Sequence, residues 1–233
     1  NGEWELEQTL EAVATAVPDS IRHMIALQLE RLTPLEQQVL HAASVAGAEF
    51  STAAVAAGLQ AEMEQVEDCC EGLARRQLFL LSTGTTVWPD GTLAASYRFQ
   101  HALQHTICYE RVTPTRRRQL HLRIGVCEER GYAAQCGDHA AALALHFAQG
   151  GEARKALHYS WQAGNNAMAR YAHHEAITHW TRGFTFLPAL GDGEEQRRHE
   201  LTLLTSLGAA LIATKGYAAA EVERVYARAL ELC

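Results

Sequence analysis

The stretch RYAHHEAITHWTRGFTFLP, residues 170–188, gathers three histidines close to a tryptophan. Imidazole nitrogens are common zinc ligands, so His173, His174 and His179 are candidates for a metal site. Ligands on one helix must share a face, which normally requires a spacing of three or four residues. At 100° per residue, His173 and His179 are about 240° apart, and His174 and His179 about 140° apart. Neither pair can hold one ion on a regular helix, and we predict no metal site here.

A structural repeat explains the same stretch better. Tetratricopeptide repeats (TPRs) are helix pairs of 34 residues, with small residues where the helices touch, an aromatic residue in the second helix and a proline at its end. With Gly164 at the glycine position of the repeat, the alanine, aromatic, small and proline positions are filled by Ala176, Trp180, Gly183 and Pro188. Ala163 and Ala167 depart from the usual leucine and tyrosine. His173 and His174 are then expected in the turn between the two helices.

Two further segments resemble this unit less closely. The segment from about residue 201 supplies Leu207, Gly208, Tyr226 and Ala229, and an earlier degenerate one supplies Leu143, Phe147, Gly150 and Ala156. Residues 137–233 are therefore expected to form a TPR-like α-solenoid. The residues that face the groove of the best-matched repeat are the candidate partner-binding residues: His158, Trp161, Asn165 and Met168. Some such repeats grip a peptide backbone or carboxylate from the position of Asn165, but Trp161 replaces the usual lysine, which counts against a carboxylate.

Two other groups of side chains invite a chemical interpretation. His101 and His105 form an i, i+4 pair on one predicted helix, but no third ligand or HExxH glutamate accompanies them, which favours a partly buried helix face. One basic cluster is present, and it consists of Arg111, Arg116, Arg117, Arg118 and Arg123. This cluster could contact phosphate, nucleic acid or an acidic partner, but a helix face docked against another domain is the favoured interpretation.

Catalytic motifs are missing from the sequence. A P-loop needs Gly-Lys-Ser/Thr, yet Lys155 is followed by Ala156 and Lys215 by Gly216. No GxSxG elbow and no Cys-His nucleophile signature is present. We therefore predict a non-catalytic segment that holds no cofactor of its own.

Composition indicates an ordinary globular protein, with 48% apolar and 20% charged residues among 233. No apolar run approaches the roughly 20 residues needed to cross a membrane, and the acidic start lacks the blocks of a signal peptide. The six cysteines show no CxxC spacing, which favours buried free thiols in a reducing compartment over disulfides. The expected location is the cytoplasm, without a membrane partner.

The apolar periodicity of the first half predicts helices followed by a hairpin. Thr33, Pro34 and Glu36 form a capping box that should start a helix ending near Gly47. Helices are expected over 51–59 and 61–79, and then two β-rich runs are joined by a Pro-Asp-Gly turn. Three helices followed by a β-hairpin is the order of a winged helix, so the expected fold is mainly α, with a winged helix and small β-hairpin before the repeats.

The helix that would read DNA in a winged helix is acidic here. Its first part, AEMEQVEDCCE, carries the carboxylates of Glu62, Glu64, Glu67, Asp68 and Glu71. Residues 1–74 contain 13 acidic side chains and two basic ones. Phosphate repulsion would oppose docking of this face in the major groove, so DNA binding is not the favoured function.

Taken together, VPDSIRHMIALQLERLTPLEQQVLHAASVAGAEFS, the WPDGT…YRFQHAL hairpin and YAHHEAITHWTRGF…TKGYAAAEVERVYARALELC resemble a region of large bacterial proteins. The region follows the ATPase in signal-transduction NTPases of the AAA/STAND type, as in LuxR-type regulators and fusions to adenylate/guanylate cyclase or kinase domains. The resemblance implies that residues 1–32 end the helical lid of the NTPase, 33–112 form the winged helix, 113–136 a connecting helix and 137–233 the repeats.

The same resemblance implies a coupling function. An upstream P-loop domain, which would hold ATP and Mg²⁺, would be the partner in cis, and the repeats would bind an unknown protein or small-molecule inducer. Two alternatives remain open. One is a stand-alone TPR adaptor, and the other is a transcription regulator that binds DNA through the winged helix and the arginine cluster.

Overall fold

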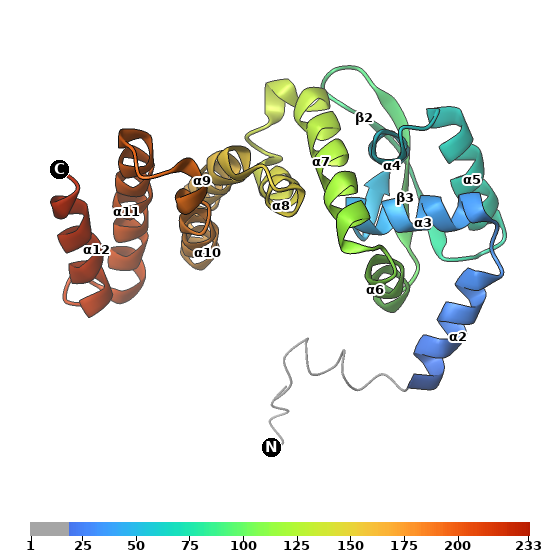
Figure 1. Ribbon diagram of the computed structural model, residues 1–233, viewed down its shortest axis with the longest axis horizontal. Helices are drawn as coiled ribbons and strands as arrows, with labels where there is room; N and C mark the ends of the chain where they lie inside the picture. The colour runs from blue at the N-terminus through green and yellow to red at the C-terminus, as the bar shows by residue number, and fades with distance from the viewer. Residues whose placement is uncertain (1–18) are drawn as a thin grey trace.

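The computed structural model describes residues 19–233 (Figure 1). Over these residues the chain contains eleven α-helices, two short 3-10 helices and one three-stranded antiparallel sheet. The prediction of a mainly helical fold with a small β-hairpin is confirmed. Residues 1–18 of the predicted lid segment 1–32 lie outside the described residues, and the rest of that segment contains helix α2 (Asp19–Glu30).

The sheet lies within the first half of the described chain. The elements there are, in order, α3 (Pro34–Ala46), β1 (Glu49–Ser51), α4 (Thr52–Leu59), α5 (Met63–Arg75), β2 (Leu80–Val87), β3 (Leu93–Phe99), α6 (Ala102–Glu110) and α7 (Pro114–Gly131). The strand order is β1-β3-β2, so the predicted hairpin of β2 and β3 gains a third strand. Strand β1 was not predicted, because three residues are too short to show an alternating pattern.

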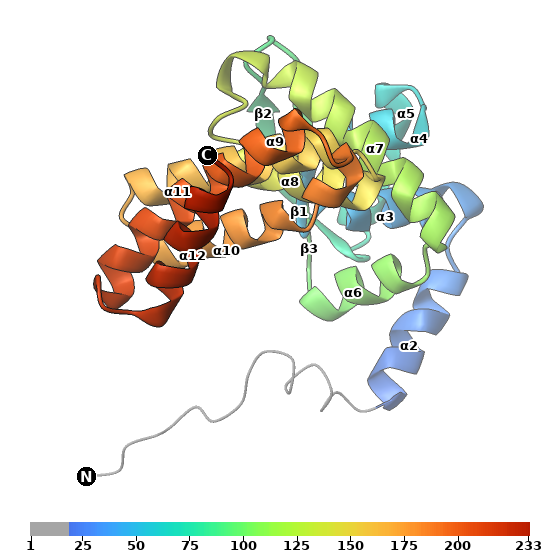
Figure 2. The ribbon, with the colours of Figure 1, turned by 60° about the vertical axis from the view of Figure 1, so that its left-hand side comes forward.

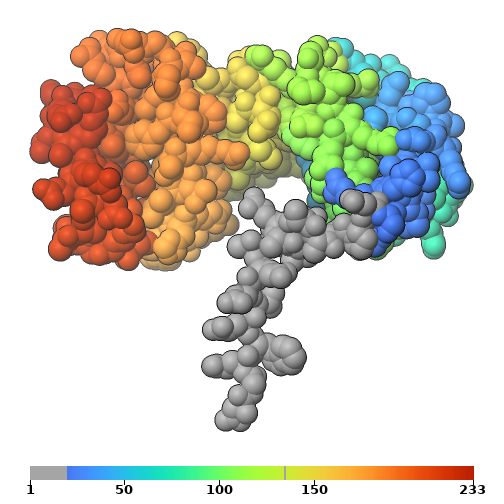
Figure 3. Space-filling model, turned by 60° about the horizontal axis from the view of Figure 1, so that its bottom comes forward, coloured from blue at the N-terminus to red at the C-terminus, as the bar shows by residue number. Residues whose placement is uncertain are grey.

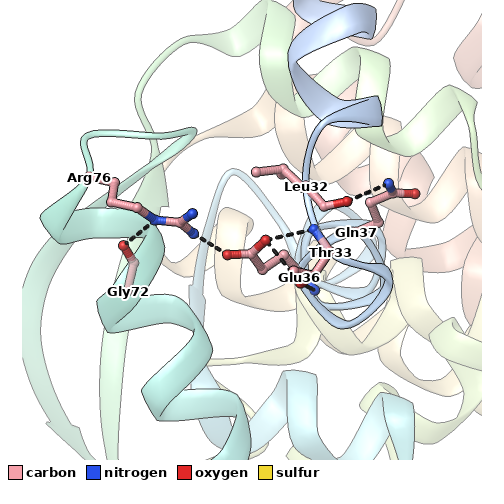
Figure 4. Close-up of polar contacts among 6 residues, drawn as sticks. All are labelled: Leu32, Thr33, Glu36, Gln37, Gly72 and Arg76. Carbon is pink, nitrogen blue, oxygen red and sulfur yellow. Dashed lines mark hydrogen bonds and ion pairs between the residues drawn. The ribbon is translucent and has the colours of Figure 1, made fainter.

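The predicted capping box at the start of α3 is confirmed (Figure 4). The Thr33 amide donates to the Glu36 carboxylate at 2.8 Å, and the Glu36 amide donates to the Thr33 hydroxyl at 3.3 Å. The guanidinium of Arg76, just after α5, also contacts Glu36. Burial opposes ionisation of Glu36, but the hydrogen bonds from Thr33 and Arg76 outweigh it and lower the pKa of this carboxyl. One glutamate therefore both starts α3 and ties it to α5.

Two Thr-Pro sequences in this chain give a matched test of this cap. Thr33 accepts a hydrogen bond from the helix it precedes, whereas the Thr113 side chain makes no cap hydrogen bond to α7. We expect Thr33→Ala to lower the free energy of unfolding by about 1 kcal/mol, and Thr113→Ala to lower it by less than about 0.5 kcal/mol. Urea denaturation of both variants measures the difference. Equal losses would show that the Thr33 side chain does not stabilise the helix start.

One hydrophobic core joins the sheet to the helices around it. Its fully buried side chains come from elements far apart in sequence: Leu29, Leu40, Leu73, Phe79, Leu80, Leu120 and Ile124. Leu120 and Ile124 belong to α7, which lies within the predicted connecting segment 113–136. The partly buried Leu122, between them, packs instead against the next core, formed by α8 and α9. Helix α7 is therefore part of two cores.

The second half of the chain is helical throughout. Its elements are a 3-10 turn η1 (Ala133–Gln135), α8 (Ala140–Gly150), α9 (Ala153–Ala169), α10 (His173–Phe184), a 3-10 turn η2 (Leu187–Leu190), α11 (Glu194–Lys215) and α12 (Ala220–Glu231). Each helix from α7 onward packs against the next one in sequence. Figure 1 shows α8–α12 extending away from the sheet, with α12 farthest from α2, and in the turned view of Figure 2 the same helices come forward of the sheet. The space-filling view shows the same order of residues along an elongated body (Figure 3).

Glycines allow the helix pairs of this half to approach closely. A Cβ atom at Gly164 of α9 would lie 2.2 Å from Nε1 of Trp180 of α10. A Cβ atom at Gly208 of α11 would lie 2.8 Å from the ring of Tyr226 of α12. In both pairs an aromatic ring of the second helix lies directly on the backbone of the first, so a larger residue at either glycine would push the helices apart.

Two histidine placements differ from the sequence prediction. His173 and His174 form the first turn of α10 rather than the loop before it, because the loop closes earlier: the Ala172 amide donates to the Ala167 carbonyl at 2.9 Å. His101 caps α6 instead of lying within it. His105 is inside that helix, and its Nε2 lies 2.9 Å from the Ser44 carbonyl oxygen.

All six cysteines are free thiols, as predicted, but the predicted burial holds only for Cys70 and Cys108: three others are half-buried and Cys233 is exposed. Burial raises the pKa of the Cys108 thiol to about 12, which keeps it protonated and unreactive at neutral pH.

None of the helices between residues 19 and 233 combines the length and apolar character required of a membrane span.

Candidate functional site

A pocket of about 260 Å³ lies between α9 and α11. Helix α9 contributes His158 and Trp161, two of the four residues predicted to face a groove, together with Leu157. Helix α11 contributes Arg198, His199, Thr202 and Leu203. The two leucines are buried, whereas the polar residues and the indole are at least partly exposed. The pocket therefore has an apolar floor and a polar rim.

Contacts with α10 hold the α9 wall of this pocket in place. Nε1 of Trp180 donates to the backbone carbonyl of Trp161 at 3.1 Å. Gly183, also on α10, leaves room beneath the floor, because a Cβ atom there would lie 3.2 Å from Leu203 and 3.5 Å from Leu157. The floor is thus continuous with the core around Trp180, and a change in that core would move the pocket wall.

The charge of the rim favours an anionic or hydrogen-bond-accepting group. Arg198 is exposed and makes no ion pair within residues 19–233. None of the residues that line the pocket is a carboxylate. Nε1 of Trp161 is buried and has no hydrogen-bond partner in the described part of the chain. Unpaired buried donors are uncommon in folded proteins, but this one is enclosed by the protein, so the charged donor that the rim offers to a ligand is the guanidinium of Arg198.

The other two predicted groove residues lie elsewhere. Met168 is half-buried in the core around Trp180, and its sulfur lies 3.2 Å from Nδ1 of His173. Asn165 is also half-buried and does not line this pocket. The structure therefore brings His158 and Trp161 together with α11 and separates them from Asn165 and Met168.

The arginine cluster predicted as an interdomain or anion contact is largely engaged inside the chain. Arg117 donates to the carbonyls of Tyr109 and Val112 at 2.8 and 3.0 Å, near the end of α6. Arg118 donates to the Gly150 carbonyl at 3.1 Å, at the end of α8. The last turns of helices leave carbonyls without intrahelical partners. These two arginines of α7 satisfy such carbonyls on two neighbouring helices.

The remaining three arginines of the cluster differ in their contacts. Arg123 donates to the Gly58 carbonyl at 3.2 Å, near the end of α4. Arg111 forms an ion pair with Glu30 of α2 at 2.9 Å. Arg116 is exposed and makes no hydrogen bond or ion pair among the described residues. Of the five, Arg116 is the one whose guanidinium is wholly available to a partner.

A buried histidine pair joins α7 to α8. Nδ1 of His121 lies 3.1 Å from Nδ1 of His146, and both side chains are almost fully buried. Tyr109 Oη lies 3.3 Å from Nε2 of His121, and a Glu128 carboxylate oxygen lies 3.7 Å from Nε2 of His146. The Glu128 carboxylate favours a proton on Nε2 of His146, which leaves Nδ1 of His146 as an acceptor. Nδ1 of His121 therefore donates to Nδ1 of His146, and Nε2 of His121 accepts from the Tyr109 hydroxyl. Both imidazoles are neutral in this arrangement.

This pair cannot be recognised in the sequence, because His121 and His146 are 25 residues apart and meet only through the packing of two helices. His139 also contacts Glu128, at 3.2 Å. Within residues 19–233, no three His, Cys, Asp or Glu side chains are arranged to hold a metal ion together. This applies to His173, His174 and His179 as well.

No protein-family model, curated protein or solved structure matches this chain. What the pocket between α9 and α11 can bind therefore follows from its own geometry and charge. A ligand with an apolar part for the leucine floor and an acceptor for Arg198 and the histidines fits it best.

Proposed function

We propose that this chain is the non-catalytic regulatory and protein-interaction segment of a multidomain signal-transduction ATPase. In this proposal a ligand or partner binds the helical repeats of residues 137–233, and binding is coupled to an upstream P-loop NTPase that holds ATP and Mg²⁺ in the cytoplasm. The observation that carries the proposal is the α9–α11 pocket, which lies in an unbroken series of packed helices that begins at α7.

The element order supports a winged helix over residues 33–112. Three helices, α3, α4 and α5, precede the β2–β3 hairpin, and the short strand β1 between the first two helices pairs with β3. This is the arrangement expected of a winged helix with a three-stranded sheet. The exposed face of α5 carries Glu64, Asp68 and Glu71, which supports a protein partner over DNA for this unit.

The helix contacts support TPR-like repeats over residues 137–233. Gly164 and Gly208 are the glycines of two predicted repeat units, and Trp180 and Tyr226 are aromatic residues in the second helices of the same units. In the structure the aromatic residue of each pair lies on the glycine of the same pair. Two positions that were matched by sequence alone thus make equivalent contacts in successive helix pairs.

Helix α7 offers a physical route for coupling. It contributes to the core around the sheet through Leu120 and Ile124, and it is bonded to the end of α8 through Arg118. Movement of α8 and α9 on binding would therefore be transmitted to α7 and to the sheet through direct contacts. A route of this kind needs two states with different contacts, and binding on the repeats would favour one of them.

Arg118 allows the coupling to be tested in the longer protein with its P-loop domain. We expect Arg118→Met to change the rate of ATP hydrolysis by about threefold or more, because it frees the end of α8 from α7. Gln119→Met is the matched control, since Gln119 is an exposed neighbour without a hydrogen bond to another described residue. Thermal unfolding of both variants checks that each is folded. An unchanged rate in folded Arg118→Met protein would favour the stand-alone adaptor instead.

A further inference from the structure

A second and larger cavity, of about 410 Å³, lies among α4, the β2–β3 hairpin and α7. Ala53 and Ala57 of α4 form one wall, and Trp88 at the end of the hairpin forms another. Helix α7 adds Val126, of which 46% is exposed. The cavity is mostly apolar and is separate from the α9–α11 pocket, because the two share no residue.

Close contacts fix the tryptophan wall of this cavity. Trp88 is 4% exposed, and its ring lies on the backbone of α7 at Gly131, where a Cβ atom would come within 2.1 Å of it. The Asp90 amide donates to the Gly131 carbonyl at 3.1 Å, which ties the hairpin turn to the end of the same helix. The alanines opposite have side chains of one methyl group each. A fixed large ring facing small side chains leaves space that the chain itself does not fill.

The charged residues that line this cavity are two arginines and one aspartate. The guanidinium of Arg123 is held by the Gly58 carbonyl at 3.2 Å. Arg130 is exposed and makes no ion pair within the described residues. The Asp90 carboxylate accepts from the Thr92 amide at 2.9 Å, which with the nearby Arg130 charge lowers the pKa of Asp90. With two positive charges against one negative charge, the lining favours an anion.

We propose that this cavity binds a small amphipathic carboxylate. Its apolar body would pack between Trp88 and the alanines of α4, and its carboxylate would be held by Arg123 and Arg130 at the edge of the cavity. Such a ligand would contact the hairpin, α4 and α7 at once. The proposal goes beyond the coupling function and does not depend on it, since it needs no upstream domain.

Direct binding to the full chain tests the proposal. The probes are the ω-phenylalkanoates from phenylacetate to 6-phenylhexanoate, each paired with the neutral alcohol of the same chain length, in titration calorimetry. We expect at least one acid to bind saturably, with one molecule per chain, and its alcohol to bind about tenfold more weakly or worse. Absence of saturable binding across the series, or equal affinity for acid and alcohol, would overturn the proposal.

Four variants locate the bound acid. Ala57→Leu, which fills the cavity, and Arg130→Gln, which removes one charge, should each weaken acid binding by about fivefold or more. Ala209→Leu and Arg182→Gln are the controls, because both residues are exposed on helices outside the cavity. The circular dichroism of each variant must match that of the unmodified chain. Equal weakening in variants and controls would contradict the assignment.

The α9–α11 pocket is also cationic, so a fifth variant separates the two sites. Trp161→Ala alters that pocket and leaves the cavity beside Trp88 intact. We expect it to bind the acid as the unmodified chain does. Loss of binding in Trp161→Ala with retention in Ala57→Leu would place the acid between α9 and α11 and overturn the proposal.

Discussion

Replacing Trp180 by alanine is expected to lower the free energy of unfolding by about 3–5 kcal/mol. Trp180 is 2% exposed, it lies on Gly164 of the neighbouring helix, and its Nε1 donates to the Trp161 carbonyl at 3.1 Å. Alanine would leave a cavity between α9 and α10 and would remove the hydrogen bond from Nε1 to the Trp161 carbonyl. Urea denaturation at pH 7.5, with the midpoint and slope compared to those of the unmodified chain, measures the loss.

Two further variants separate the causes of this loss. Trp180→Phe keeps most of the ring but removes the hydrogen bond, so its cost should fall between that of Trp180→Ala and zero. Tyr171→Ala removes an aromatic residue that is 83% exposed, and it should change the free energy of unfolding by no more than about 0.5 kcal/mol. A similar small effect for Trp180→Ala would contradict the packing of α9 on α10 described above.

Acidification from pH 7.5 to pH 5 is expected to destabilise the fold through the buried histidine pair. Burial, together with the charges of His146 and Arg117, lowers the pKa of His121 to about 3, and burial also lowers the pKa of His146 despite the opposing charge of Glu128. The unfolded chain takes up protons near pH 6.5, whereas the folded chain does not. The contribution of the neutral histidine pair to the free energy of unfolding is therefore fully present above pH 6.5, and it is lost as the pH falls toward 3.

For His121 alone, the free energy of unfolding is expected to fall by about 2 kcal/mol between pH 7.5 and pH 5. Urea denaturation at several pH values between 7.5 and 5 measures it. His121→Gln keeps a hydrogen-bonding side chain that cannot titrate, so this variant should be less stable at pH 7.5 but should lose less stability between pH 7.5 and pH 5. The same pH dependence in His121→Gln and in the unmodified chain would show that the pair does not cause the acid sensitivity.

Features with a local cause could be predicted from the sequence. The capping box of Thr33 and Glu36 lies within four residues, and its geometry follows from the residue types alone. The mainly helical second half follows from apolar periodicity, and the small and aromatic residues that meet in it, such as Gly164 and Trp180, were identified by their spacing. These signals need no knowledge of how distant elements pack.

The candidate site could be predicted only in part. His158 and Trp161 line the pocket because α11 passes beside the first half of α9, and nothing in the sequence fixes where that crossing occurs. Asn165 and Met168 share the same helical face but lie beyond the crossing. The same reason applies to the arginines of α7: Arg118 bonds a helix end that is 32 residues away. The charge cluster in the sequence therefore did not reveal that Arg117, Arg118 and Arg123 donate to backbone carbonyls.

The proposed regulation of an ATPase is checked by the rate of ATP hydrolysis in a protein that contains this chain together with the proposed P-loop domain. The rate should be measured with residues 19–233 present and with them removed, under conditions where the proposed P-loop domain remains folded and binds nucleotide. We expect removal to change the rate by about threefold or more, because the segment would bias the NTPase between two states. An unchanged rate, or an upstream sequence without a Gly-Lys-Ser/Thr loop, would contradict the claim that this segment regulates an ATPase.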